Sequence, residues 1–219
     1  MKTTLLLLAG LSLSPGLWAQ STTYLYTGNS LSVSDFTPPC GTGPCANFPA
    51  GAHWSGQLTT SSPLPSSAPM NNIFSMVSSF SFTNGLNFFS SADSNLRVNS
   101  IFASTDVAGN IALGDLTVFI WQSGSSPHSS GDRLAFMQIN LPDLAYNNRA
   151  CQTVGISYSG VLDSCILQAA SDASTSEGAQ NTPGTWTKAT ASSPVQNGAS
   201  SRKLHGAAGS IDMPLSPGP

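Results

Sequence analysis

Two histidines in the central part of the chain, His53 and His128, are the side chains best suited to act as bases in hydrolysis. A serine hydrolase combines such a base with a serine nucleophile and with an acid that orients the imidazole. The Gly-x-Ser-x-Gly nucleophile elbow does not occur, and the nearest segment, residues 155–160, has a different spacing that fits a strand. We therefore interpret both histidines as surface or turn residues. An exported hydrolase stays an alternative, which requires that His53 or His128 lie beside an aspartate and a serine at the rim of a pocket.

Paired carboxylates would indicate glycoside hydrolysis, and of the ten acidic residues only Glu177 is a glutamate. Glu177 lies in the polar segment 171–181, where we do not expect a buried acid with a raised pKa. Several aspartates stand near serine, glycine or asparagine in sequences typical of turns: Asp93, Asp106, Asp132 and Asp172. Residues 93–95 and 106–110 do not match an EF-hand calcium loop. We expect no catalytic residue, no metal-binding residue and no cofactor.

The four cysteines could form disulfides or bind a metal ion. In an exported chain an even number of cysteines predicts disulfides first, and four cysteines allow three connectivities. Short intervening segments favour Cys40 with Cys45 and Cys151 with Cys165. In the chain-entropy model these closures would stabilise the fold by about 2 and about 3 kcal/mol. The spacing from Cys151 to Cys165 is too long for the paired spacings of a four-cysteine zinc site.

Aromatic side chains offer a second kind of chemistry, because tryptophan and tyrosine rings stack on sugar rings when several of them share one exposed face. The candidates for ligand stacking are Trp54, Trp121 and Trp186. Tyrosines that could join them are Tyr24, Tyr26, Tyr146 and Tyr158. The competing interpretation is that these rings form the core of a β-sandwich, as aromatic residues on alternating strands usually do.

Short alternating apolar segments between residues 22 and 187, with turn residues every ten or so positions, predict the elements that would carry these side chains. The expected fold is all-β, an antiparallel jelly-roll-like β-sandwich with short helical turns at most. The expected strands cover residues 24–27, 57–60, 77–83, 86–90, 96–103, 111–121, 134–140, 154–158 and 165–169.

Two details of this pattern are specific. The Asn84-Gly85 pair predicts a hairpin between the third and fourth of these strands. Residues 111–121 are apolar on both faces near their end, which predicts a strand in the interior of a sheet. Brief helices are possible only at residues 72–76 or 141–149.

The N-terminal residues 1–19 have the features of a signal peptide: Lys2, an apolar run over residues 5–13 and Ala19 before the expected cleavage. Only 8% of the residues are charged, against about a quarter in ordinary soluble proteins, and the formal net charge is −3. Without a basic run, nucleic acid is not an expected partner. We expect a β-sandwich domain over residues 20–187 and a disordered Ser, Ala, Gly and Pro-rich tail over residues 188–219, with no membrane span in the mature chain.

Four short motifs occur in this order: residues 24–29 (YLYTGN), 80–85 (FSFTNG), 104–111 (STDVAGNI) and 183–187 (PGTWT). Together they resemble a group of uncharacterised exported bacterial proteins that usually carry a C-terminal PEP-CTERM sorting signal. The resemblance implies a β-sandwich at the cell surface or in the extracellular matrix, and it implies no catalytic residue. The chain departs from the group after Thr187, where a Pro-Glu-Pro motif, an apolar helix and a basic end are expected. This departure indicates either release without anchoring or an ending lost through a frameshift or a misread gene end.

These observations predict an exported, non-enzymatic β-sandwich protein that is secreted or held at the cell surface as a surface or matrix component. The alternative is a carbohydrate-binding module, and the third interpretation is a secreted hydrolase. The partners expected are extracellular polysaccharide or other surface components.

Overall fold

The computed structural model describes residues 20–36, 40–41, 43–140 and 142–189. The signal-peptide prediction for residues 1–19 and the disorder prediction for residues 190–219 lie outside this part of the chain. The folded domain extends slightly past the expected boundary, because Lys188 is the last residue of a strand.

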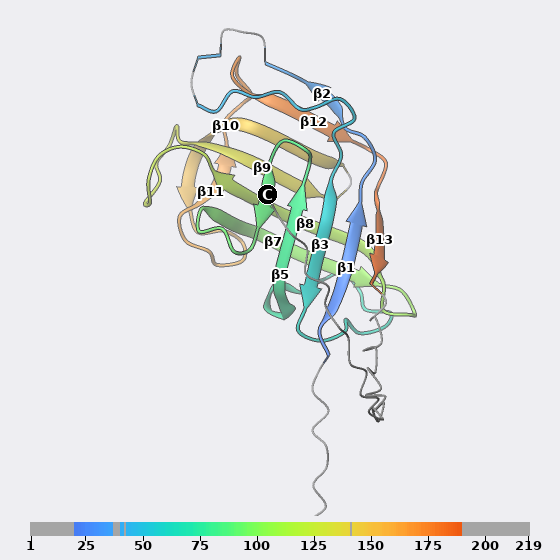
Figure 1. The fold of residues 1–219 in the computed structure, drawn as a ribbon. Coiled ribbons are helices and arrows are strands. Elements are labelled where there is room, and N and C mark those ends of the chain that lie inside the picture. Colours follow the sequence, from blue (N-terminus) through green and yellow to red (C-terminus); the bar gives the residue numbers. More distant parts are fainter. Residues whose placement is uncertain (1–19, 37–39, 42, 141, 190–219) are drawn as a thin grey trace, which may run out of the picture.

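Two antiparallel sheets face each other, which confirms the expected all-β sandwich. In order across the smaller sheet, the strands are β13 (Thr185–Lys188), β1 (Thr22–Thr27), β3 (Ser55–Thr60), β5 (Val77–Thr83) and β6 (Phe88–Ser90). The larger sheet has the order β2 (Ser32–Ser34), β12 (Ser176–Gln180), β10 (Asp143–Gly155), β9 (Arg133–Ile139), β8 (Ile111–Trp121), β7 (Leu96–Thr105) and β4 (Asn71–Asn72). Its eighth strand, β11 (Ser164–Gln168), pairs with β10. In Figure 1 the strands β5, β3, β1 and β13 run roughly vertically and those of the larger sheet cross them obliquely.

The core lies between the sheets and follows from the alternation of side chains along each strand. On β8, Leu116 and Val118 point inward and pack in one cluster with residues of the smaller sheet such as Tyr24, Trp54 and Phe82. The chain passes between the sheets repeatedly in its first half, and β7 to β10 then form a meander within the larger sheet.

The other face of the larger sheet is also partly covered. A second apolar cluster contains Phe119 and Trp121 of β8 with Leu134 and Phe136 of β9, and the two cysteines Cys151 and Cys165 pack against them. This arrangement explains why β8 is apolar on both faces. The prediction that this strand lies in the interior of a sheet is confirmed, since β8 pairs with β7 on one side and β9 on the other.

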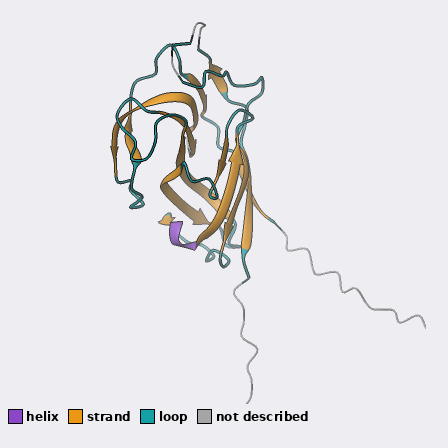
Figure 2. Ribbon diagram, turned by 60° about the vertical axis from the view of Figure 1, so that its left-hand side comes forward, coloured by secondary structure: helices purple, strands orange, loops and turns teal. Residues whose placement is uncertain are grey.

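The short-range predictions are mostly confirmed. The strands β5 and β6 form the expected hairpin, and Gly85 adopts a φ of 87° in its turn. A single turn of 3-10 helix at Phe74–Met76 falls within the expected stretch 72–76, and strands otherwise make up the regular structure of the described residues (Figure 2).

The helix considered for residues 141–149 is wrong, because Asp143–Gly155 is one long strand. Residues 154–155, expected to start a separate strand, are the end of β10. The strand forms because β9 and β12 pair with its first half on opposite sides, which satisfies its backbone hydrogen-bonding groups.

Both disulfides have the predicted local pairing. Cys40 is bonded to Cys45 with their Cα atoms 6.0 Å apart, and Cys151 is bonded to Cys165 with their Cα atoms 5.7 Å apart. The second bond joins the paired strands β10 and β11, so it holds the hairpin that these two strands form.

Candidate ligand-binding groove

A groove of about 530 Å³ lies on the outer face of the larger sheet, the face turned away from the sandwich core. Three of the aromatic side chains that line it form a row, because they are partners in the register of neighbouring strands. Phe119 of β8 lies beside Phe136 of β9, which lies beside Tyr146 of β10. The two phenylalanines are buried and Tyr146 is half-buried. This row gives the groove an apolar floor.

A second row crosses the same strands one step further along and is mainly polar. Ser100 of β7, Thr117 of β8, Gln138 of β9 and Leu144 of β10 are successive register partners. Hydroxyl and amide groups therefore stand directly beside the apolar floor. Such a combination suits a ligand that has both apolar and hydroxyl-bearing surfaces.

The hairpin of β10 and β11 forms one wall. It reaches across the sheet to β7, where the Ser157 hydroxyl donates to the carbonyl of Val98 (2.9 Å) and the Ser159 amide donates to the carbonyl of Asn99 (3.0 Å). In Figure 1 β11 lies on the left side of the molecule. Residues 165–168 of β11 line the groove, so its width depends on the hairpin's position.

Gln168 on this wall has a buried side-chain oxygen, Oε1, for which the described residues supply no donor. A buried acceptor without a donor is unfavourable, and most such groups in native proteins have a partner.

Arg149 is the one cationic side chain that lines the groove. Its Nε donates to the carbonyl of Ala169 (2.8 Å), and its guanidinium carbon lies 4.0 Å from the centre of the Tyr146 ring. These two contacts hold the guanidinium in place. No carboxylate among the described residues forms an ion pair with it.

Two acidic residues belong to the groove and its continuation. Burial raises the pKa of Asp115 on β8, and a hydrogen bond from Thr117 (3.3 Å) only partly opposes that rise. Glu177 of β12 is the register partner of Tyr146 and lines an adjoining hollow of about 210 Å³ that shares Leu144 and Tyr146 with the groove. Three strand spacings separate β8 from β12, about 14 Å at roughly 4.8 Å each. That separation exceeds the carboxylate spacing of glycosidases, about 5 to 9.5 Å.

The three tryptophans considered for ligand stacking lie in separate places, and none of them lines the groove. Trp54 is fully buried in the core, with its indole Nε1 donating to the carbonyl of Leu144 (3.3 Å). Trp121 is buried under the His128 ring, 4.2 Å away and nearly parallel. Trp186 is half-buried beside Tyr26. Of the tyrosines named with them, Tyr146 alone lies in the groove.

The histidines also lie outside the groove. His53 is exposed, and its Nδ1 contacts the carbonyl of Gly51 (3.0 Å). His128 does lie beside an aspartate, Asp163, and the hydroxyl of Ser126 also hydrogen-bonds to that carboxylate. In a catalytic triad the serine contacts the imidazole nitrogen opposite the acid, whereas Ser126 contacts the acid. This geometry suits a structural link better than an activated nucleophile.

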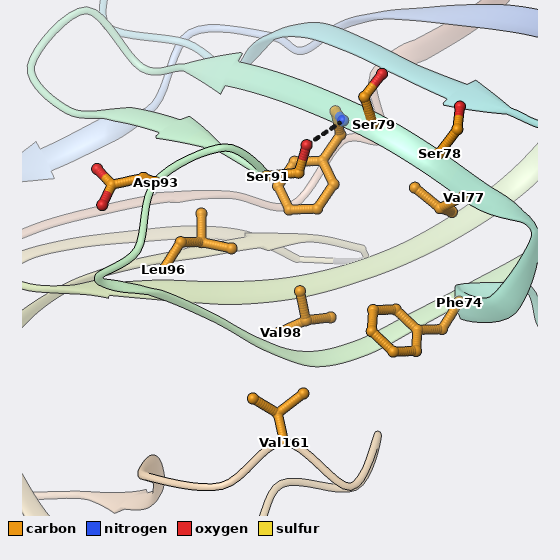
Figure 3. Close-up of a pocket in the computed structure, with 10 residues that line it drawn as sticks. Phe74, Val77, Ser78, Ser79, Ser91, Asp93, Leu96, Val98 and Val161 are labelled. Carbon is orange, nitrogen blue, oxygen red and sulfur yellow. Dashed lines mark hydrogen bonds between the residues drawn. The ribbon is translucent and has the colours of Figure 1, made fainter. Parts of the chain in front are cut away.

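A second hollow, of about 210 Å³, opens near β5 and β7 (Figure 3). Its walls are mainly apolar side chains: Phe74, Val77, Leu96, Val98 and Val161. Three polar residues at its edge, Ser78, Ser91 and Asp93, are hydrogen-bonded to backbone groups. The Ser91 hydroxyl accepts from the Phe80 amide (3.1 Å), as drawn in Figure 3, and Asp93 accepts from the Asn95 amide (2.8 Å). This hollow therefore offers a ligand little polar recognition, and the groove is the better candidate site.

Comparisons with protein-family models, with curated proteins and with solved structures found no match to this chain. In the described part of the chain, no three His, Cys, Asp or Glu side chains come together as a metal site requires. None of the helical residues described belongs to a helix long and apolar enough to cross a membrane.

Sequence reasoning placed Tyr146 among possible ligand contacts but did not find the groove. Phe119 could have been identified, because the apolar outer face of residues 111–121 requires a cover or a ligand. Phe136 and Arg149 carry no local signal of this kind, since their place in the groove depends on strand register.

Proposed function

We propose that this protein is an exported, non-enzymatic glycan-binding β-sandwich that acts as a cell-surface or extracellular-matrix component, and that the groove over β7 to β10 is its binding site. The observation that carries the proposal is the pairing of the two rows. Beside the buried phenylalanine floor, the half-buried Tyr146 and the exposed Ile166 and Leu167 offer apolar surface to sugar rings, and the half-buried amide of Gln138 suits their hydroxyl groups.

The extent of the groove favours an oligosaccharide or polysaccharide over a single sugar. The main hollow crosses four strands of the larger sheet, and the adjoining hollow continues the surface over β12 and β2. At roughly 4.8 Å per strand spacing, the six strands from β7 to β2 span about 24 Å. A surface of this length supports binding to a chain of sugars.

The charged groups of the groove support binding without hydrolysis. Asp115 and Glu177 stand too far apart to act as a carboxylate pair on one glycosidic bond. The His128 and Asp163 pair lies outside the residues that line the groove. The two disulfides are compatible with an extracellular protein, as they persist in oxidising compartments. The resemblance to the exported PEP-CTERM group agrees with a surface or matrix role.

The test is binding of the full chain, with its disulfides oxidised, to a panel of soluble neutral and acidic polysaccharides by affinity electrophoresis and calorimetry. The variant Gln138→Leu removes the amide at the centre of the polar row and should weaken binding about tenfold. Gln57→Leu is the matched control, because Gln57 is exposed on β3 of the smaller sheet. Absence of binding to every polysaccharide, or equal binding by Gln138→Leu and the wild type, would contradict the proposal.

A further inference from the structure

The three arginines in the described part of the chain differ in their partners. Arg97 forms an ion pair with Asp163 (2.9 Å), and Arg133 forms two hydrogen bonds with the carboxylate of Asp172 (2.6 and 3.1 Å). Arg149 has no such carboxylate, although it is partly buried in the groove. Partly buried cations in proteins usually have an anionic partner.

The contacts that hold the Arg149 side chain in place leave most of its hydrogen-bond donors available. A guanidinium has five N–H donors in a planar fork, and only the one on Nε is engaged by a carbonyl, that of Ala169. The four N–H groups on its two terminal nitrogens have no partner among the described residues. Packing over the Tyr146 ring restricts the rotamers of the side chain, so a ligand that binds it causes little further loss of entropy.

From these observations we infer that the groove binds an acidic glycan, and that Arg149 receives an anionic group of one sugar through a bidentate pair of hydrogen bonds. The inference rests on the proposed glycan-binding function and names the ligand class. The carboxylate of a uronic acid and a sulfate ester each present two oxygen atoms that can accept a pair of hydrogen bonds from one guanidinium.

The two acidic residues of the groove and its continuation constrain where the anionic group lies. The Arg149 guanidinium lies over Tyr146, whose register row includes Phe119, four residues along β8 from Asp115 and about 13 Å from it at roughly 3.3 Å per residue. Glu177 is closer, one strand beyond Tyr146, and it does not form an ion pair with Arg149. A like charge at Glu177 would oppose an acidic chain that continues over β12, so Glu177→Gln should strengthen binding.

The experiment compares the full chain with Arg149→Gln, Arg149→Lys and Glu177→Gln for binding to polygalacturonate and alginate, to dextran sulfate, and to neutral glucomannan and dextran. Losing a charged hydrogen bond should lower the affinity of Arg149→Gln for the acidic glycan about tenfold to a hundredfold, with neutral glycans unchanged. Arg149→Lys should recover part of the affinity because it keeps the charge but not the fork. Lys188→Gln, which removes the same charge from the end of β13 in the smaller sheet, is the control.

The outcomes separate this inference from the proposed function. Tighter binding to the uronate glycans or to dextran sulfate identifies the anionic group. In either case, affinity that depends on Arg149 and falls with added salt supports the inference. Binding to neutral glycans that Gln138→Leu weakens and Arg149→Gln does not would overturn the inference and leave the proposed function standing. Binding to none of the probes would overturn both. Thermal unfolding by circular dichroism shows that each variant is folded before its binding is compared.

Discussion

The Nδ1 atom of His128 lies 2.8 Å from Oδ2 of Asp163, and the same oxygen lies 2.9 Å from a terminal nitrogen of Arg97. The backbone amide of His128 donates to the other carboxylate oxygen (2.7 Å), and the indole of Trp121 donates to the carbonyl of Asp163 (3.0 Å). Asp163 precedes β11 in the hairpin that forms the groove wall, whereas its partners belong to β7, to β8 and to the loop after β8. This cluster therefore joins the wall to the sheet.

Replacing Asp163 with asparagine should destabilise the fold by about 2 to 3 kcal/mol, because it leaves His128 and Arg97 without their charged acceptor in a largely buried site. Urea unfolding followed by fluorescence measures the change. Asp106→Asn is the matched control, since in this exposed turn asparagine keeps the oxygen that accepts from the Ala108 and Asn110 amides and loses only the bond from the Asn110 side chain (2.9 Å). A loss no larger than that of the control would show that the cluster contributes little.

Acidification should weaken the fold between about pH 4 and pH 2. Hydrogen bonds from Arg133, opposed by partial burial, lower the pKa of Asp172 to about 2. Burial alone would raise the pKa of Asp163, but hydrogen bonds from His128, Arg97 and Ser126 outweigh it and lower that pKa further. Both carboxylates therefore stabilise the folded state above their unfolded pKa values, near 4, and lose that effect as the pH falls through their folded values.

Asp143 has the opposite effect on the pH dependence of stability. Burial raises its pKa, so the folded state favours the protonated carboxyl, and acidification stabilises the fold through this residue. The melting temperature measured at pH 7, 4 and 2.5 gives the net effect. The variant that combines Asp163→Asn with Asp172→Asn should lose most of the decrease between pH 4 and 2.5. If the melting temperature of this variant fell as much as that of the wild type, other titratable groups would be responsible for the acid sensitivity.

The hydroxyl of Tyr26 donates to Oδ2 of the fully buried Asp143 (2.6 Å), and this bond connects the two sheets. Burial, followed by the effect of Asp143, raises the pKa of Tyr26, so its phenol stays a donor at neutral pH. Tyr26→Phe should lower the free energy of unfolding by about 1 to 3 kcal/mol, because it leaves Oδ2 of the buried Asp143 and the Gly184 amide without their hydrogen-bond partner. Tyr158→Phe, at a tyrosine that is 75% exposed, should change it by less than about 0.5 kcal/mol in the same urea titration.

Removal of either disulfide should lower stability, but only removal of the one between Cys151 and Cys165 should also weaken glycan binding. Replacing Cys151 and Cys165 with serine should cost about 3 kcal/mol and also abolish or strongly weaken glycan binding, because the bond holds the hairpin that walls the groove. Replacing Cys40 and Cys45 should cost about 2 kcal/mol and leave binding within about twofold, since these cysteines do not line the groove. Calorimetry with the polysaccharide that the wild type binds, at a temperature where both variants are folded, gives the comparison. Equal binding by the two variants would mean that β11 does not shape the site.

Elements with a strong local pattern were predictable. The hairpin around Asn84 and Gly85 depends on a dipeptide that favours a tight turn, and the strand over residues 111–121 depends on its own alternation. The strand β12 was not predicted, because its sequence SEGAQ has little preference for strands. It forms because β10 and β2 pair with it from either side.

For this protein, local residue patterns were sufficient to predict the β-sandwich, its main hairpins and the pairing of cysteines that are close in sequence. These local patterns did not predict the groove. Phe119, Phe136 and Tyr146 become neighbours through the register of three strands, and Arg149 meets the carbonyl of Ala169 only when the hairpin folds back. Alternation tells which side of a strand a residue occupies, but register between strands is set by packing and pairing of the whole sheet. The site therefore follows from contacts between distant segments, which no local pattern encodes.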